Sequence, residues 1–209
     1  MAHDAVILTL PYSTLRLVDL HRSLAIPDWQ RRIIQDFDYG RNTKLNVGFT
    51  RRIWGDYGSE GASYSDLANH QATWEPNPRN ATPGNAVLLD YSGGQRAARL
   101  DPSRTDAAVA DWLADLDQVW PGAAAAARRA PDGRIAAHMQ HWPSDPFSLG
   151  SYTSNPPGYF TEWEGRVGLP VGNLSFAGEH TDSFYEWQGF MEGACNSGIR
   201  AATELLRSR

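Results

Sequence analysis

The sequence predicts a mixed α/β fold in which short strands and helices alternate along the chain. Apolar runs of strand length occur at 4–10 and 86–91, and residues 103–119 carry apolar side chains at the three- and four-residue spacing of a helix. The end of the chain reads as a strand, a glycine turn bearing an acidic residue, a loop and a helix. With 209 residues, of which 41% are hydrophobic, the chain can bury a core in one or two domains.

The first half of the chain is expected to contain mostly strands. Residues 4–10 do not alternate with polar residues and are therefore predicted to form a fully buried strand. Residues 27–37 predict a helix that begins with a proline, which is favoured at a helix start. Further strands are predicted at 43–50 and 86–91, and a shorter one at 71–75.

The second half is expected to be more helical. A helix is predicted over 103–119, with Ser103 as its N-cap. The alanine run at 123–127 is expected to be helical, and residues 134–141 are expected to form a strand. Residues 144–172 are rich in Gly, Pro, Ser and Tyr, which predicts an ordered loop region.

The last helix carries two stripes of small residues at a spacing of four, which places each stripe on one face. Glycine within a helix costs roughly 1 kcal/mol relative to alanine. A chain that accepts this cost usually needs the close approach of a flat molecule or of another backbone. The alternative is an ordinary amphipathic helix after a strand. The two stripes are Gly193, Ser197 and Ala201, and Ala194, Gly198 and Ala202.

Charge and cysteine content narrow the class of protein. The balance of 19 basic and 24 acidic residues gives a net charge of −5, which argues against a nucleic-acid partner. No apolar run approaches the roughly 20 residues of a membrane helix, so a soluble protein without a membrane partner is expected. The single cysteine, Cys195, is expected to be a small core residue of the last helix, and the low cysteine content suits a cytoplasmic location, with export left open. His138 and His141 should point to opposite faces of a strand, so no metal site is expected.

Three motifs near the end of the chain carry a family resemblance. They are Phe-Ala-Gly-Glu-His-Thr at 176–181, Gly-Phe-Met-Glu-Gly-Ala at 189–194 and Ser-Gly-Ile-Arg-Ala-Ala at 197–202. With these motifs the chain resembles the flavin-dependent amine oxidases, the family of monoamine, polyamine and L-amino acid oxidases. The earlier segments 4–11, 39–49 and 142–152 resemble further family segments in the same order, so the resemblance spans nearly the whole chain.

One feature of that family is missing from this sequence. The family's first unit is a strand, a Gly-x-Gly-x-x-Gly turn and a helix, which seats the pyrophosphate of the dinucleotide, and no such motif occurs here. The two glycines in 86–100 are better read as a plain strand-to-helix turn. The resemblance therefore implies the C-terminal half of a two-domain FAD-linked amine oxidase. Residues 1–25 and 144–209 would belong to the FAD-binding domain, and 26–143 to a substrate-binding domain with a mixed sheet.

The resemblance also implies a cofactor site for FAD. The start of the last helix would point at the N1 and C2-carbonyl end of the flavin, with the backbone of Met191 as a donor. Glu179 would accept hydrogen bonds from the backbone and from ribityl groups, whereas the alternative is a capping or solvent-exposed acid. The cofactor-binding residues implied are Gly178, Glu179, Gly189, Phe190, Met191 and Glu192.

Around the reacting atoms, the resemblance assigns Lys44 the catalytic role of holding a water at flavin N5, although spacing alone favours a solvent-facing lysine. Tyr152 and Phe190 match the two aromatic walls beside the substrate, and Trp187 either lines that pocket or packs the loop. Ser151 stands where some members carry a flavin-linking cysteine, so non-covalent FAD is expected.

The implied reaction is oxidation of an amine or amino acid to an imine, with oxygen as acceptor and hydrogen peroxide as product. It would require a missing N-terminal FAD-binding half or chain. The main alternative is a non-catalytic subunit or an inactive remnant of such an oxidase, and a weaker one is a related flavin oxidase acting on C–C bonds. The sequence does not identify the substrate, because residues that recognise it can lie in the absent half.

Overall fold

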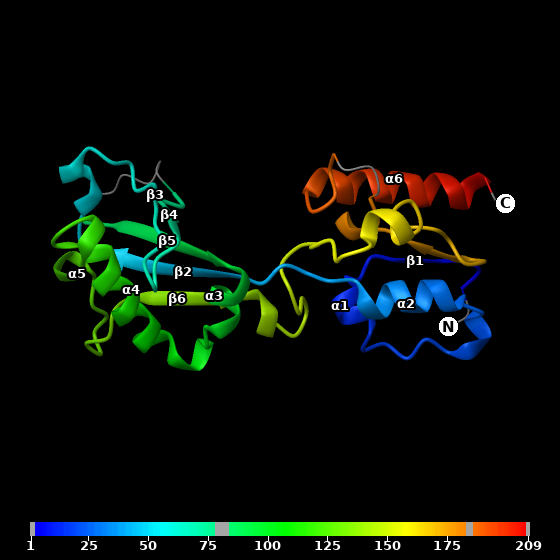
Figure 1. Cartoon of the computed structure of the whole chain (residues 1–209), viewed down its shortest axis with the longest axis horizontal. Helices are drawn as coiled ribbons and strands as arrows, with labels where there is room; N and C mark the ends of the chain where they lie inside the picture. The colour runs from blue at the N-terminus through cyan, green and yellow to red at the C-terminus, as the bar shows by residue number, and fades with distance from the viewer. Residues whose placement is uncertain (1–2, 78–83, 183–185, 208–209) are drawn as a thin grey trace. The chain divides into compact units, whose positions relative to one another are not determined.

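The computed structural model describes residues 3–77, 84–182 and 186–207. It divides into two compact units (Figure 1). The first unit holds the chain up to Gly40 together with the chain from Ser144 onward, and the second unit holds Arg41–Pro143. The sequence predicted this division after residue 25. In the structure, the segment 26–40 lies in the first unit rather than with the middle of the chain.

The second unit is built on a five-stranded sheet with the strand order β3-β4-β5-β2-β6 (Figure 1). Every pairing in this sheet is antiparallel, whereas a mixed sheet was expected. The steps from β3 to β4 and from β4 to β5 join strands that follow one another along the chain, whereas β2 pairs with β5 and β6 across longer connections. The strands are β2 (Asn42–Phe49), β3 (Ser63–Tyr64), β4 (Ala72–Trp74), β5 (Ala86–Gly93) and β6 (Ala137–His141).

The core of the second unit lies between this sheet and its helices. Residues Leu45, Val47 and Phe49 of β2 are buried on one face. Against them pack Trp112 and Leu116 of helix α4, which belong to an apolar stripe at helical spacing. The helices are α3 (Gly94–Arg99), α4 (Thr105–Val119) and α5 (Ala123–Ala126), and the 3-10 turns are Ile53–Tyr57, Pro102–Arg104 and Trp142–Ser144.

The predicted strands at 43–50, 71–75, 86–91 and 134–141 are confirmed with small changes in their ends. The predicted N-cap at Ser103 is wrong, because a separate 3-10 turn precedes α4. The side chain of Asp101 caps that turn by accepting the Ser103 N–H at 2.9 Å. The α-helix then begins at Thr105.

The first unit joins the two ends of the chain. Strand β1 (Val6–Leu8) pairs in parallel with β7 (Leu174–Phe176). An aromatic cluster that includes Tyr12, Phe37 and His180 fills its core. The remaining elements are the helices α1 (Tyr12–Leu15), α2 (Asp28–Asp36) and α6 (Met191–Arg207), the π-helical turn Tyr159–Trp163, and the 3-10 turns Arg22–Leu24 and Glu179–Thr181.

The prediction of a fully buried first strand is wrong. Val6 is 42% exposed and Ile7 is 37% exposed. β1 has β7 as its one strand neighbour within the described residues, so its other edge and much of its surface are uncovered. The predicted helices at 27–37 and at the end of the chain are confirmed as α2 and α6.

Within the described residues, no helix is both long and apolar enough to cross a membrane. The same residues contain no group of three or more His, Cys, Asp or Glu side chains placed to hold a metal ion.

Candidate functional site

The start of helix α6 is open to solvent. The chain turns at Gly189, whose φ of +86° is rarely adopted by other residues, and Phe190 N–H donates to the Trp187 carbonyl at 3.0 Å. The first intrahelical bond runs from Ala194 N–H to the Phe190 carbonyl, so the amides of the first turn have no acceptor within the helix. Met191 is 88% exposed. This helix end therefore offers N–H donors and a partial positive charge to a ligand.

Glu179 joins the two segments that carry the predicted aromatic walls. Its carboxylate accepts the Thr153 N–H at 3.1 Å, the Thr153 hydroxyl at 2.9 Å and the Gly189 N–H at 2.7 Å. Burial raises the pKa of Glu179, and these three donors act against that rise. Glu179 thus accepts from two backbone N–H groups, one in the segment around Thr153 and one at Gly189 just before α6.

Three exposed aromatic side chains surround the start of α6. Tyr152 precedes Thr153 and is 45% exposed, and a Cβ at Gly189 would lie 4.0 Å from its ring. The rings of Trp187 and Phe190 meet edge to face with centroids 6.3 Å apart. The structure thus brings Tyr152, Trp187 and Phe190 to one region. Because the Trp187 ring contacts Phe190, Trp187 can pack against the loop and line a pocket beside Phe190 at the same time.

The two stripes of small residues on α6 have different environments. Gly193, Ser197 and Ala201 are the buried residues of the helix. A Cβ at Gly193 would lie 2.2 Å from the Trp187 carbonyl oxygen, and Ser197 Oγ accepts the Gly178 N–H at 2.9 Å. The close approach at this stripe is therefore made by the chain's own backbone. On the second stripe, a Cβ at Gly198 would meet nothing within 4 Å.

Arg200 fixes α6 to the rest of the first unit, a role the sequence analysis missed. Its guanidinium donates to the carbonyls of Gly168 and Phe176, each at 2.8 Å. It also donates to the Thr181 hydroxyl at 3.2 Å and forms an ion pair with Glu204. This role could have been predicted from the sequence, because Arg200 lies next to the small-residue stripe, where its long side chain can reach neighbouring carbonyls.

Lys44 lies on β2 in the second unit and is the only lysine in the sequence. It is half-buried, and its neighbours in register are Tyr91 on β5 and Gln140 on β6. Because side chains alternate along a strand, Lys44 faces away from the core that holds Leu45. Trp74 lies beside Tyr91 on the same side, with ring centroids 5.4 Å apart. Sequence reasoning missed these neighbours because strand register was not known.

Ser151 donates its hydroxyl to the Gly40 carbonyl at 2.8 Å. Cys195, expected to be a small core residue, is exposed on α6, because it lies off the inward-facing stripe. His138 is exposed, whereas His141 is buried with Nε2 3.0 Å from the Ala97 carbonyl oxygen. This confirms that the two histidines lie on opposite faces of β6.

The residues at the start of α6 fit the ring end of a flavin. Unpaired backbone donors at a helix N-terminus suit the negative charge that a reduced flavin ring carries, and exposed aromatic faces suit a flat ring. Gly178, just after β7, has a φ of +126°, and a Cβ at this position would lie 2.6 Å from the His180 ring. This sequence supplies no pyrophosphate-binding loop beside these donors, because it contains no Gly-x-Gly-x-x-Gly.

Comparison with curated proteins finds relatives over almost all of the chain. A putative L-amino-acid oxidase of Bacillus subtilis (strain 168) is 29% identical over 98% of the chain and 41% of its own length. Polyamine oxidase 3 of Oryza sativa subsp. japonica is 27% identical over 96% of the chain and 39% of its own length. The chain thus spans about two fifths of the length of these relatives.

Solved structures share the fold. Cyclohexylamine oxidase from Brevibacterium oxydans IH-35A superposes with a TM-score of 0.76 at 21% identity, covering 98% of this chain and 43% of that one. A putrescine oxidase variant superposes with a TM-score of 0.78 at 18% identity and the same coverage. The family model described as flavin containing amine oxidoreductase matches residues 1–206. The chain therefore belongs to the flavin containing amine oxidoreductase family.

Proposed function

We propose that this chain supplies the ring-facing part of an FAD site and part of the substrate pocket in an oxidase of amines or amino acids. The observation that carries the proposal is the open start of α6, where Glu179 holds together exposed aromatic rings and first-turn amides that have no acceptor within the helix. Within this proposal the first unit is part of an FAD-binding domain, and the second unit is part of a substrate-binding domain.

Bound FAD would supply the two-electron acceptor, taking hydride from the carbon next to the amine nitrogen and passing electrons to oxygen, with an imine and hydrogen peroxide as products. The chain's own contribution is electrostatic. The N–H of Met191, at the positive end of α6, would stabilise negative charge at the N1 and C2-carbonyl edge of the ring. Gly189 and Glu192 complete that helix start.

Tyr152 and Phe190 would bracket the substrate amine, with Trp187 extending the aromatic lining. The Phe190 side of the pocket has no hydroxyl, so it contributes a flat apolar wall without a hydrogen bond. Lys44 Nζ would hold a water next to flavin N5, where its ammonium can donate while the water exchanges a proton. Its half-buried position beside Tyr91 and Gln140 supports a specific role over a freely solvated one.

We propose that the FAD is held without a covalent bond. Ser151 stands where some family members carry a flavin-linking cysteine. Its hydroxyl donates to the Gly40 carbonyl, and a hydroxyl is a far weaker nucleophile than a thiolate. Cys195, the only thiol, lies on an exposed part of α6. One cysteine also suits a reducing compartment, so a cytoplasmic location is proposed.

A complementary polypeptide that carries the pyrophosphate loop is part of the proposal. Parallel strands normally lie in larger sheets that are covered on both faces, yet β1 and β7 form a two-stranded parallel sheet. Apolar side chains on and after β1 are exposed, among them Leu10 at 42%, Leu17 at 73% and Val18 at 45%. This surface supports an N-terminal FAD-binding half, on the same or a separate chain, that pairs with β1.

The substrate class follows from the relatives, whose names are those of polyamine and L-amino-acid oxidases. A test is to co-express the chain with a complementary half that contains Gly-x-Gly-x-x-Gly and to measure peroxide release on panels of amines and amino acids. Peroxide release that requires both halves would support the proposal. An assembled complex that holds FAD and oxidises none of the panel would favour the non-catalytic alternative instead.

A further inference from the structure

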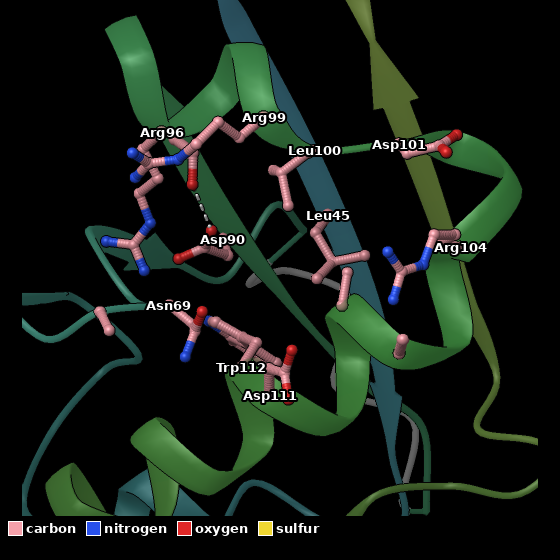
Figure 2. A pocket seen from close by; sticks show the side chains of 14 residues that line it. Leu45, Asn69, Asp90, Arg96, Arg99, Leu100, Asp101, Arg104, Asp111 and Trp112 are labelled. Atoms are coloured by element: carbon pink, nitrogen blue, oxygen red, sulfur yellow. Dashed lines mark hydrogen bonds between the residues drawn. The ribbon is translucent and has the colours of Figure 1, made fainter.

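A pocket of about 230 Å³ lies on the helix-covered face of the second unit's sheet (Figure 2). The Lys44 side chain is on the opposite face. Three arginines line it: Arg96 and Arg99 from α3, and Arg104 from the turn before α4. Asp90 of β5 and Trp112 of α4 form its inner wall, and Figure 2 shows Asp90 between Arg96 and Trp112. None of the residues proposed above for the FAD site or the substrate pocket lines it.

Arg96 is only partly satisfied. One terminal nitrogen, Nη1, donates to the Leu67 carbonyl at 3.1 Å, whereas Nη2 is buried and has no hydrogen-bond partner among the described residues. Burial lowers the pKa of Arg96, the charges of Asp90 and Asp115 act against that shift, and the positive charge of Arg99 adds to it. A buried guanidinium edge without an acceptor is costly, so a bound acceptor at this point would be stabilising.

The other two arginines of the pocket are also unused. Within the described residues, the guanidinium groups of Arg99 and Arg104 make no hydrogen bond or ion pair. The Trp112 side chain is 1% exposed, and its indole N–H faces the Asp90 carboxyl, whose pKa it lowers. Arginines that gather despite mutual repulsion are the arrangement expected of a site for a negatively charged group.

The acidic residues of the pocket are mostly occupied. Asp90 is 3% exposed, accepts the Ser92 hydroxyl at 2.9 Å and the Gln71 N–H at 3.4 Å, and has its pKa raised by burial. Asp101 accepts the N–H and hydroxyl of Ser103. Asp111 remains at the exposed rim. The unused hydrogen-bonding groups are therefore mainly donors, which selects for an anion over an ammonium ion.

We propose that this pocket binds a small multivalent oxyanion of the phosphate type. Arg96 would bind it from the inner wall through Nη2, and Arg99 and Arg104 would close over it from the rim. A volume of 230 Å³ accommodates such an ion with a few waters, since one water takes about 30 Å³ of liquid volume. Forked guanidinium donors match the oxygens of such an ion.

The test is calorimetric titration of the 209-residue chain with inorganic phosphate, at ionic strength held constant with chloride. One saturable site per chain is expected. The double variant R99Q/R104Q should weaken it by at least about tenfold, which corresponds to 1.4 kcal/mol. Both arginines are exposed, so this variant should fold. The matched control R22Q/R207Q removes two exposed arginines that do not line the pocket and should change the affinity less than about twofold.

A second variant tests the inner wall. Arg96→Lys keeps the charge but removes the fork, and should also weaken phosphate binding by about tenfold or more if Nη2 holds the ion. Acetate, titrated in parallel, should bind much more weakly than phosphate. Absence of saturable phosphate binding to the unaltered chain, equal affinity in R99Q/R104Q and in the control, or acetate binding as tight as phosphate would each overturn the proposal. Flavin content plays no part in these outcomes.

Discussion

The Glu179 carboxylate accepts the Gly189 N–H at 2.7 Å, and through this contact one half-buried acid sets the entry of the chain into α6. The same carboxylate holds Thr153 by its N–H and its hydroxyl. Tyr152 and Phe190 are the residues directly next to these two anchors. The two proposed aromatic walls therefore depend on one carboxylate, even though Glu179 itself need not touch the substrate.

Replacing Glu179 by glutamine should destabilise the first unit. Glutamine has one carbonyl oxygen, so its NH₂ group must face either the Gly189 N–H or the Thr153 donors. Leaving a buried donor unsatisfied costs about 1–3 kcal/mol. Urea unfolding of Glu179→Gln should show a loss of that order. The exposed carboxylate of Glu60 gives a matched control, Glu60→Gln, which should unfold like the unaltered chain. Equal stabilities for both variants would contradict the anchoring role.

Two glycines of α6 should respond in opposite ways to the same substitution. Gly193→Ala places a Cβ against the Trp187 carbonyl oxygen, and the backbone must move, at a cost of about 1–3 kcal/mol. Gly198→Ala adds a Cβ in open space and should stabilise the helix by up to about 1 kcal/mol. Thermal unfolding compares the pair directly. A stabilising Gly193→Ala would show that the loop at Trp187 does not press on the helix.

Acid should weaken the first unit through His180. This side chain is 2% exposed, and burial lowers its pKa to about 3 from an ordinary value of 6.5. Below pH 6.5 the unfolded chain takes up a proton that the folded chain does not, so stability is complete above pH 6.5 and falls as pH decreases toward 3. The slope is about 1.4 kcal/mol per pH unit, or roughly 2 kcal/mol at pH 5.

The variant His180→Leu should remove that part of the pH dependence of the unfolding free energy, because leucine does not titrate. His138→Leu replaces an exposed histidine and should leave the dependence in place. Chemical denaturation between pH 4 and pH 7 separates the two variants. Parallel curves for His180→Leu and the unaltered chain would show that the pKa of His180 is the same in the folded and the unfolded chain.

Lys44→Met should slow flavin reduction or reoxidation in the assembled enzyme by one or more powers of ten, at least about 1.4 kcal/mol on a barrier. The reason is loss of the ammonium that would hold a water at N5, while methionine keeps the length and apolar stem. Stopped-flow measurement resolves the two half-reactions. FAD content and thermal stability serve as controls and should change little. Unchanged rates at full FAD occupancy would remove Lys44 from the reaction.

Local patterns predicted the elements that position the site. The strands β2 and β5, the strand-to-helix turn at Gly93 and the helix α6 were readable from spacing and turn residues, whereas the stripe of α6 that faces inward was not. The exposure of Val6 was not, because burial of a strand depends on what covers it. The partners of Glu179, Lys44 and Arg200 were also hidden, because register and loop contacts join residues that are far apart in sequence.

The central claim is that this chain builds the ring-facing part of an FAD site together with a complementary half. The most direct measurement is the flavin content of the purified chain, alone and co-purified with that half, after gel filtration and acid precipitation. The account predicts a colourless chain alone, about one FAD in the assembled protein, and release of all colour to the acid supernatant. A folded two-part complex that retains no FAD would contradict it.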